Sequence, residues 1–177
     1  LFFFLSYDKF ESPTQLEWGP QGSSSPNETF ATQASYDQVR EIAERVYGFD
    51  AGIWNQQPIE EDEKILAKLD WNINDDHRAS FTYQNTEGNV TRGMTSRDSE
   101  LKLNTHWYNN FQALESYATH FYSNWTDNFT TEIKVAYKEV KTEAQPVTKD
   151  FGDIKVYTDT NDRGDPSNPI SFGPDQY

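Results

Sequence analysis

The chain has 177 residues, a formal net charge of −14 and no cysteine, which leaves room for one ordinary domain. The missing cysteines exclude a disulfide framework and thiolate metal sites, and the acidic balance argues against binding nucleic acid or an anionic lipid surface through charge alone. No run of about 18 apolar residues occurs, which excludes a transmembrane helix but leaves transmembrane β-strands open.

The first segment, residues 1–10, begins with the apolar run "LFFFL" and continues with alternating side chains, which predicts a β-strand. The run is too short for the apolar core of a signal peptide and has no basic flank. We therefore expect a strand entered partway and a chain that is a piece of a longer protein. A polar segment rich in Pro, Gly and Ser follows and predicts a long loop.

A short amphipathic helix is predicted over residues 36–47, inside that loop. Ser35 is a suitable N-cap, Gln38 completes a capping box, and Gly48 stands where a helix-ending glycine belongs. The apolar spacing i, i+3, i+4, i+7 is met by Val39, Ile42, Ala43 and Val46. A loop of about fifty residues is unusual in a compact domain and is often functional.

Two strands are predicted next, over residues 63–74 and 78–86, as a hairpin. Apolar residues occupy the odd positions of both arms, so odd positions must face odd positions across the hairpin. The predicted pairs are Ile73 with Ala79, Trp71 with Phe81, and Leu69 with Tyr83. This register leaves a three-residue loop, Asp75 to His77, closed by Asn74 opposite Arg78.

A second hairpin is predicted from strands over residues 111–125 and 129–141, again with apolar odd positions. Trp125 would face Phe129 across the loop Thr126, Asp127 and Asn128, where Asp and Asn can adopt the left-handed conformation. A last strand is predicted over residues 170–177, after another polar connection. Tight turns thus alternate with long loops along the chain.

Alternation of this kind is typical both of a soluble β-sandwich and of a membrane barrel. Three features favour the barrel: the arms are long enough to cross a bilayer, tight turns alternate with long loops, and aromatic residues cluster beside the two turns. The predicted membrane-interface girdle consists of Trp71, Phe81, Trp125 and Phe129. The predicted fold is therefore all-β, a segment of about six strands of an antiparallel transmembrane β-barrel with long extracellular loops and one loop helix.

The even positions of the same strands predict a polar face toward a hydrated or plugged lumen. Mutual pairing of its charges is the simplest role for this face, and none of its side chains is predicted to contact a substrate. The lumen-facing candidates are Lys68, Asp70, Arg78, Thr82, Gln84, Glu132, Lys134 and Lys138.

No catalytic, cofactor or metal site is predicted, so we do not expect an enzyme. The stretch "DTNDRGD" begins like a calcium loop, but Arg163 stands at its fifth position and Ile170 where the twelfth-position Glu belongs. An irregular calcium site in this acidic loop stays open. The histidines His77, His106 and His120 lack metal-ligand spacing, and we expect them to be solvated.

The sequence resembles TonB-dependent outer-membrane receptors of the Oar-like kind, which carry a carboxypeptidase-regulatory-like domain. The resemblance rests on the stretches "FFFLSYDKFE", "YDQVREIAERVYGFDAG", "EKILAKLDWNINDDHRASFTY", "FYSNWTDNFTTEIKVAYKEV" and "ISFGPDQY". It implies a barrel of about twenty-two strands in the bacterial outer membrane that takes up a substrate in an energy-coupled way. The implied partners are the lipid bilayer, the plug domain and remaining barrel of the parent chain, and an inner-membrane energy-coupling protein. The plug and N-terminal domains would lie outside residues 1–177.

Two alternatives remain at this point. A secreted β-sandwich adhesin or glycan-binding module would use exposed Trp and Tyr side chains to stack on sugars. A passive outer-membrane barrel would share the strands and loops but not the energy coupling.

Overall fold

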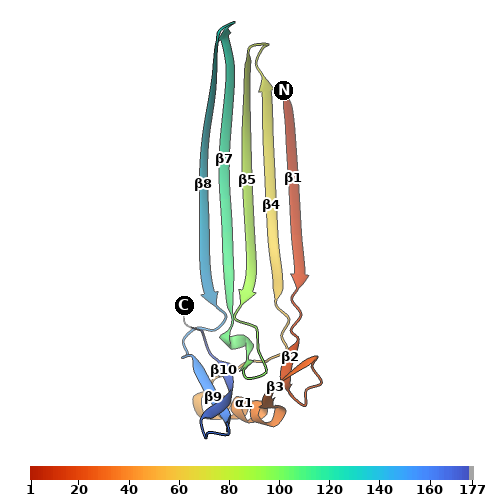
Figure 1. The fold of residues 1–177 in the computed structure, drawn as a ribbon, viewed down its shortest axis with the longest axis vertical. Coiled ribbons are helices and arrows are strands. Elements are labelled where there is room, and N and C mark those ends of the chain that lie inside the picture. The colour runs from red at the N-terminus through yellow and green to blue at the C-terminus, as the bar shows by residue number, and fades with distance from the viewer. Residues whose placement is uncertain (176–177) are drawn as a thin grey trace. The chain divides into compact units, whose positions relative to one another are not determined.

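A computed structural model of the chain describes residues 1–175 (Figure 1). The chain divides into two compact units, each built from several chain segments. We call the first the long sheet; it comprises Leu1–Ser12, Glu60–Asn89 and Phe111–Glu143. We call the second the loop unit; it comprises Pro13–Ile59, Val90–Asn110 and Ala144–Tyr177.

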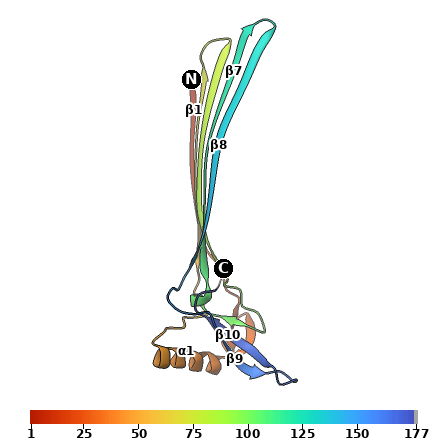
Figure 2. The same ribbon diagram turned by 90° about the vertical axis from the view of Figure 1, so that its left-hand side faces the viewer.

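The long sheet has five strands in the order β1-β4-β5-β7-β8, and neighbouring strands run in opposite directions (Figure 1). Seen from the side the sheet is twisted, as expected of chains of L-amino acids (Figure 2). Its strands are β1 (Phe2–Pro13), β4 (Ile59–Asn72), β5 (His77–Arg92), β7 (Tyr108–Thr126) and β8 (Phe129–Pro146). The prediction of an antiparallel all-β fold is confirmed; the sheet is open, and in residues 1–175 no strand pairs with the outer edge of β1 or β8.

The last predicted strand, over residues 170–177, is found in part, at residues 170–172, but it is not a sixth strand of the long sheet. Residues 166–172 form β10 (Pro166–Phe172), which belongs to a separate three-stranded sheet in the loop unit. The side chains of Ile170 and Phe172 are part of the apolar core of that unit, which accounts for the position of β10. Residues 176 and 177 of the predicted strand lie outside the described residues.

The first hairpin has the predicted parity but not the predicted register. Trp71 lies opposite Ala79, Leu69 opposite Phe81, and Asn72 opposite Arg78, so the strands are displaced by two residues from the expected pairing. The cause is local: the Asn74 side-chain oxygen accepts hydrogen bonds from the backbone N–H groups of Asp76 and His77, at 3.0 and 2.8 Å. Asn74 therefore belongs to the turn and not to the strand end.

The second hairpin turns more tightly than predicted. β7 runs through Thr126 and β8 begins at Phe129, which leaves Asp127 and Asn128 as the turn. Neither adopts a positive φ angle; among the described non-glycine residues that conformation occurs at Ser24, Asp150 and Asn168. The expected left-handed loop residues are therefore wrong, because a two-residue turn replaces the three-residue loop.

The loop unit contains one helix, α1 (Gln33–Tyr47), which matches the predicted helix but starts earlier. Its N-cap is Thr32, whose hydroxyl accepts a hydrogen bond from the Ser35 backbone N–H at 3.1 Å, so the predicted N-cap at Ser35 is wrong by one turn. Gly48 ends the helix in the left-handed conformation, as predicted. Among the described residues, no helix has the length and hydropathy that a membrane crossing requires.

The short strands of the loop unit form small sheets: β2 (Trp18–Gln21) pairs with β3 (Asn27–Thr32), and β10 pairs with both β6 (Leu101–Lys102) and β9 (Ile154–Thr160). A 3-10 helix, η1 (Asn104–His106), follows β6. The apolar core of the unit comprises Ala31, Tyr36, Val39, Ala43, Ala51, Leu101, Leu103, Ile170 and Phe172. Segments from three distant parts of the sequence thus share one core.

Candidate functional site

The odd-numbered positions of the long sheet form a broad apolar face, which we call the odd face. Its side chains remain largely exposed: Trp125 is 53% exposed, Val135 65% and Phe3 77%. Monomeric soluble proteins rarely expose a contiguous apolar patch of more than a few hundred Å². The exposed large members of this face are Leu1, Phe3, Leu5, Tyr7, Ile65, Leu69, Trp71, Ile73, Phe81, Phe111, Tyr117, Trp125, Phe129, Ile133, Val135 and Tyr137.

The predicted girdle residues lie on the odd face near the two tight turns. Trp71, Phe81 and Phe129 are 51%, 41% and 56% exposed. Trp71 and Phe81 are not the direct cross-strand pair that we predicted. Trp71 lies opposite Ala79 and Phe81 lies opposite Leu69, each two positions from the expected partner. Trp125 donates a hydrogen bond from its indole N–H to the Thr131 hydroxyl at 2.8 Å, so its ring is anchored across the hairpin.

His77 joins this girdle and is not the solvated turn residue that we expected. Its ring lies 5.1 Å from the Trp125 ring and 6.3 Å from the Phe121 ring, measured between centroids. Its Nδ1 is 2.8 Å from the Ser123 hydroxyl, which is fully buried. The first turn and β7 are further joined by a backbone hydrogen bond from Asn124 to Asp76. The two hairpins therefore form one continuous aromatic edge.

A second aromatic row, which the sequence reasoning missed, crosses the odd face farther from the turns. The ring of Tyr117 lies 5.1 Å from that of Tyr83 and 6.4 Å from that of Tyr137. Tyr117 and Tyr137 donate hydrogen bonds to the acids two residues away, Glu115 and Glu139, at 2.6 and 3.2 Å. The available signal was a tyrosine two residues away from an acidic residue on the same face, which occurs at Tyr117 with Glu115 and at Tyr137 with Glu139.

Beyond the tyrosine row the odd face carries mostly charged residues, with Phe111 exposed among them. Lys9 of β1 lies 2.5 Å from Glu11 and 3.7 Å from Glu63 of β4. Lys141 pairs with Glu139 at 3.1 Å. The odd face is thus an apolar band with an aromatic row along each border, Trp and Phe beside the turns and Tyr beside the charged residues.

The even-numbered positions form the opposite face, which we call the even face. It carries the charged side chains described below together with the exposed apolar side chains of Phe2, Phe4, Phe10, Leu66 and Val140. Lys68 pairs with Asp70 at 2.9 Å, and the Arg78 guanidinium lies 4.8 Å from the centre of the Tyr122 ring. An open hollow of about 430 Å³ lies over these side chains. The predicted lumen-facing residues Thr82 and Gln84 lie opposite Lys68 and Leu66 in the hairpin register.

Glu132 holds the other charge cluster of the even face. Its carboxylate lies 2.7 Å from the Lys134 ammonium and 2.8 Å from Nε2 of His120. Lys138 is exposed on the same strand. Alternation along residues 111–125 already places His120 and Tyr122 on this face, although the sequence reasoning did not name them there. Their contacts with Glu132 and Arg78 follow from the position of β7 between β5 and β8.

The remaining site predictions concern metals and histidines in the loop unit. His106 is 2% exposed and lies 3.1 Å from the Gly173 carbonyl oxygen and 3.5 Å from Asp153, so the expectation of a solvated side chain is wrong. In the stretch from Asp159 to Asp165, the Asn161 side-chain oxygen accepts hydrogen bonds from the backbone N–H groups of Arg163 and Asp165. Within residues 1–175 no group of His, Asp and Glu is arranged to hold a metal ion.

One carboxylate of the loop unit, that of Glu100, has a pKa below its ordinary value. Burial opposes ionisation of Glu100, but hydrogen bonds from the Ser171 hydroxyl at 2.7 Å and Lys155 at 3.1 Å outweigh it and lower the pKa. The hydrogen bond to Glu100 correspondingly raises the pKa of Lys155. This pair joins β9 to the segment before β6 and has a structural role within the unit.

No known protein family, curated protein or solved structure matches this chain. The chemistry of the two faces of the long sheet is therefore the basis for assigning a function. The odd face exposes mostly apolar side chains, and the even face carries most of the charge pairs near the turns.

Proposed function

We propose that the long sheet is a segment of a transmembrane β-barrel in a bacterial outer membrane, with its odd face toward lipid and its even face toward the lumen. The observation that carries the proposal is the exposed apolar band with an aromatic row on each border. Outer-membrane barrels have an outward apolar band about 25 Å tall between two aromatic girdles.

The dimensions of the band agree with this assignment. From Phe129 to Tyr137, β8 advances by about 26 Å at about 3.3 Å per residue. From Ile65 to Ile73, the β4 segment and the start of its turn span the same length. Strand tilt shortens the height along the membrane normal, and the aromatic side chains at both ends extend it again.

The edges of the long sheet support a continuation beyond these strands. β1 and β8 present their outer N–H and C=O groups without a partner strand in the described part of the chain. Backbone groups exposed to lipid must be hydrogen-bonded, which is why sheets in membranes close into barrels. The rest of the barrel would pair with these two edges.

The connections between the strands support an orientation of the long sheet in the membrane. The tight turns after β4 and β7 would face the periplasm, and the loop unit, which supplies the long connections, would lie outside the cell. Its own apolar core allows it to fold in water without the membrane.

The function proposed for the parent protein is energy-coupled uptake as a TonB-dependent receptor of the Oar-like kind. The support is the sequence resemblance together with the charge pairs of the even face, which suit a hydrated or plugged lumen. A plug domain of the parent chain would lie against this face, and an inner-membrane protein would supply the energy. A β-sandwich adhesin is less compatible, since a second sheet would bury side chains such as Val135 that are exposed.

The membrane assignment is tested by flotation of the chain with phospholipid vesicles on a density gradient. We expect the chain to float with the lipid and to resist extraction by alkaline carbonate. External protease should then cut the loop unit while leaving fragments that contain the two hairpins. A chain that is monomeric without detergent and stays at the bottom of the gradient would refute the proposal.

Energy coupling is tested in cells that produce the parent protein. Inactivation of the inner-membrane coupling protein should abolish substrate uptake while leaving the amount of parent protein in the outer membrane unchanged. Uptake that persists would identify a passive barrel instead.

A further inference from the structure

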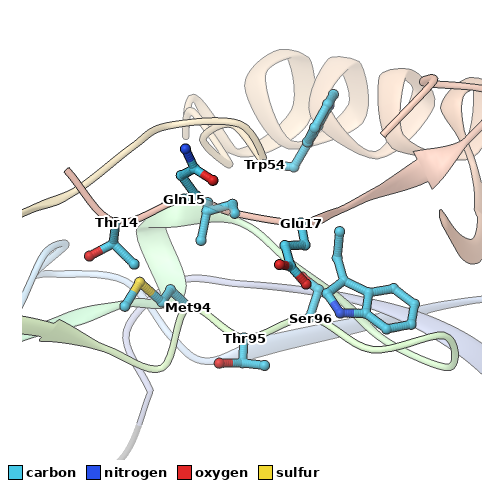
Figure 3. A pocket seen from close by; sticks show the side chains of 9 residues that line it. Thr14, Gln15, Glu17, Trp54, Met94, Thr95 and Ser96 are labelled. Carbon is cyan, nitrogen blue, oxygen red and sulfur yellow. The ribbon is translucent and has the colours of Figure 1, made fainter. Parts of the chain in front are cut away.

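We propose that a hollow in the loop unit binds a single neutral sugar residue. The hollow has a volume of about 180 Å³ and lies between the chain segments 14–18 and 94–96, beside Trp54. Figure 3 shows the two segments running past one another, with the Glu17 side chain extending from one toward Ser96 on the other. All of these residues belong to the loop unit, so the site does not depend on the long sheet.

Both walls of the hollow are held in place by the surrounding chain. The Thr14 backbone N–H donates to the Pro58 carbonyl at 2.8 Å, and the Ser96 hydroxyl accepts a hydrogen bond from the Lys102 backbone N–H at 2.9 Å. Trp54 packs close to the Gly19 backbone, since a Cβ at Gly19 would lie 2.9 Å from its ring. The indole can take this position because residue 19 has no side chain.

The lining combines flat apolar surface with hydrogen-bonding groups. Trp18 and Trp54 contribute two indole rings, and Thr14, Gln15, Glu17 and Thr95 contribute hydroxyl, amide and carboxylate groups. A sugar ring presents C–H groups on its faces, which pack on aromatic rings, and hydroxyl groups around its rim. A ring with apolar faces and a rim of uncharged hydroxyl groups matches both kinds of wall, which is why we infer a sugar.

The charge of the lining and the volume of the hollow restrict the class of ligand further. The hollow is lined by one carboxylate, Glu17, and by no Lys or Arg side chain, so an anionic ligand would be repelled. The Glu17 carboxylate accepts one long hydrogen bond, from the Asn27 side-chain amide at 3.4 Å. It therefore retains acceptor capacity for ligand hydroxyl groups. The volume equals about six water molecules at about 30 Å³ each, which is the space of one small ring.

The test is saturation-transfer difference NMR on the whole chain in detergent micelles, with glucose, galactose, mannose and N-acetylglucosamine offered separately. We expect at least one sugar to give a saturable signal that is strongest at its ring C–H protons. Choline is offered in parallel, because a cation could also stack on indole beside a carboxylate.

Three variants test whether the NMR signal comes from a sugar bound in this hollow. Trp54→Ala should abolish it, and Gln15→Ala, which keeps both indoles, should weaken binding about tenfold, the effect of about 1.4 kcal/mol. The matched control is Trp125→Ala on the long sheet, which should leave sugar binding unchanged. Near-ultraviolet circular dichroism checks that each variant is folded.

The proposal is overturned if none of the sugars binds, if only choline binds, or if folded Gln15→Ala and Trp54→Ala both bind the sugar as the original chain does. None of these outcomes bears on the membrane assignment, because vesicle flotation does not involve this hollow.

Discussion

The loop unit and the long sheet use apolar residues in opposite ways. The loop unit buries its apolar side chains in a core, with Leu101, Leu103 and Ile170 fully inaccessible. On the long sheet the single buried side chain of the described residues is polar, that of Ser123, while Trp, Phe, Ile and Val side chains point outward. Apolar content alone therefore does not reveal a core, and under the membrane assignment proposed above the two regions would face two different solvents.

The difference also explains the composition. Only 34% of residues are hydrophobic, yet 15% are aromatic. The long sheet places its rings along the borders of the odd face, where an amphipathic ring suits a membrane interface. The loop unit instead places its rings inside, where Trp107 is buried and Phe49, Phe151 and Phe172 stack on one another beside aliphatic side chains.

The largest contrast is expected from one substitution made in both regions. Leu103→Ala should destabilise the loop unit by about 2–5 kcal/mol, because it leaves a cavity in a packed core. Leu69→Ala on the odd face should cost only about 1 kcal/mol, since its exposed side chain leaves no cavity. Urea unfolding of each variant in vesicles measures both, and equal costs would show that the odd face is packed on protein.

A lysine introduced on one face or the other of the long sheet tests the difference between the two faces. Ile133→Lys, in the middle of the apolar band, should weaken the free energy of membrane insertion by about 2–4 kcal/mol. Thr82→Lys on the even face is the matched control and should change it by less than about 1 kcal/mol. Urea titration in phospholipid vesicles measures the difference, and a tolerated Lys at position 133 would argue against lipid contact.

The helix cap tests whether the loop unit behaves as an ordinary water-soluble fold. Thr32→Ala should lower its free energy of unfolding by about 1 kcal/mol, because Thr32 caps the first turn of α1. Ser35→Ala, at the N-cap expected from sequence, should cost less. Thermal unfolding followed by circular dichroism ranks the two, and the reverse order would move the helix start back to Ser35.

The smallest effect concerns pH and the loop unit. The pKa of Glu100 is lowered in the folded state, so its contribution to stability is complete above the ordinary value of 4.5 and is lost as pH falls through the lowered value. Because Lys155 is partly exposed, we expect less than about 1 kcal/mol. Unfolding at neutral and acidic pH should show this loss, and Glu100→Gln should reduce it; an unchanged slope in the variant would assign the loss to other carboxylates.

The strands of the long sheet could be predicted because alternation has a period of two and survives over long arms. The exact register could not, since a displacement by two residues preserves every face. What decided it was the Asn74 side chain binding two backbone N–H groups of the turn, a contact that alternation does not encode.

The interior of the loop unit was beyond sequence reasoning for a different reason. Ile170 pairs in parallel with Leu101, so the strand expected from residue 170 onward could be assigned to this sheet only together with β6, which was not predicted. The tyrosine row has the same character: Tyr83, Tyr117 and Tyr137 become neighbours only after three strands are placed side by side. Long periodic segments could be read from the sequence, and contacts between distant short ones could not.

The claim that the odd face meets lipid is tested most directly by spin labels along β8. The chain has no cysteine, so single cysteines can be introduced and labelled at each position from 130 to 138 in vesicle-bound protein. The account predicts a period of two, with odd positions accessible to oxygen dissolved in the bilayer and even positions accessible to a water-soluble nickel complex. Equal access of the nickel complex to both sets of positions would contradict it.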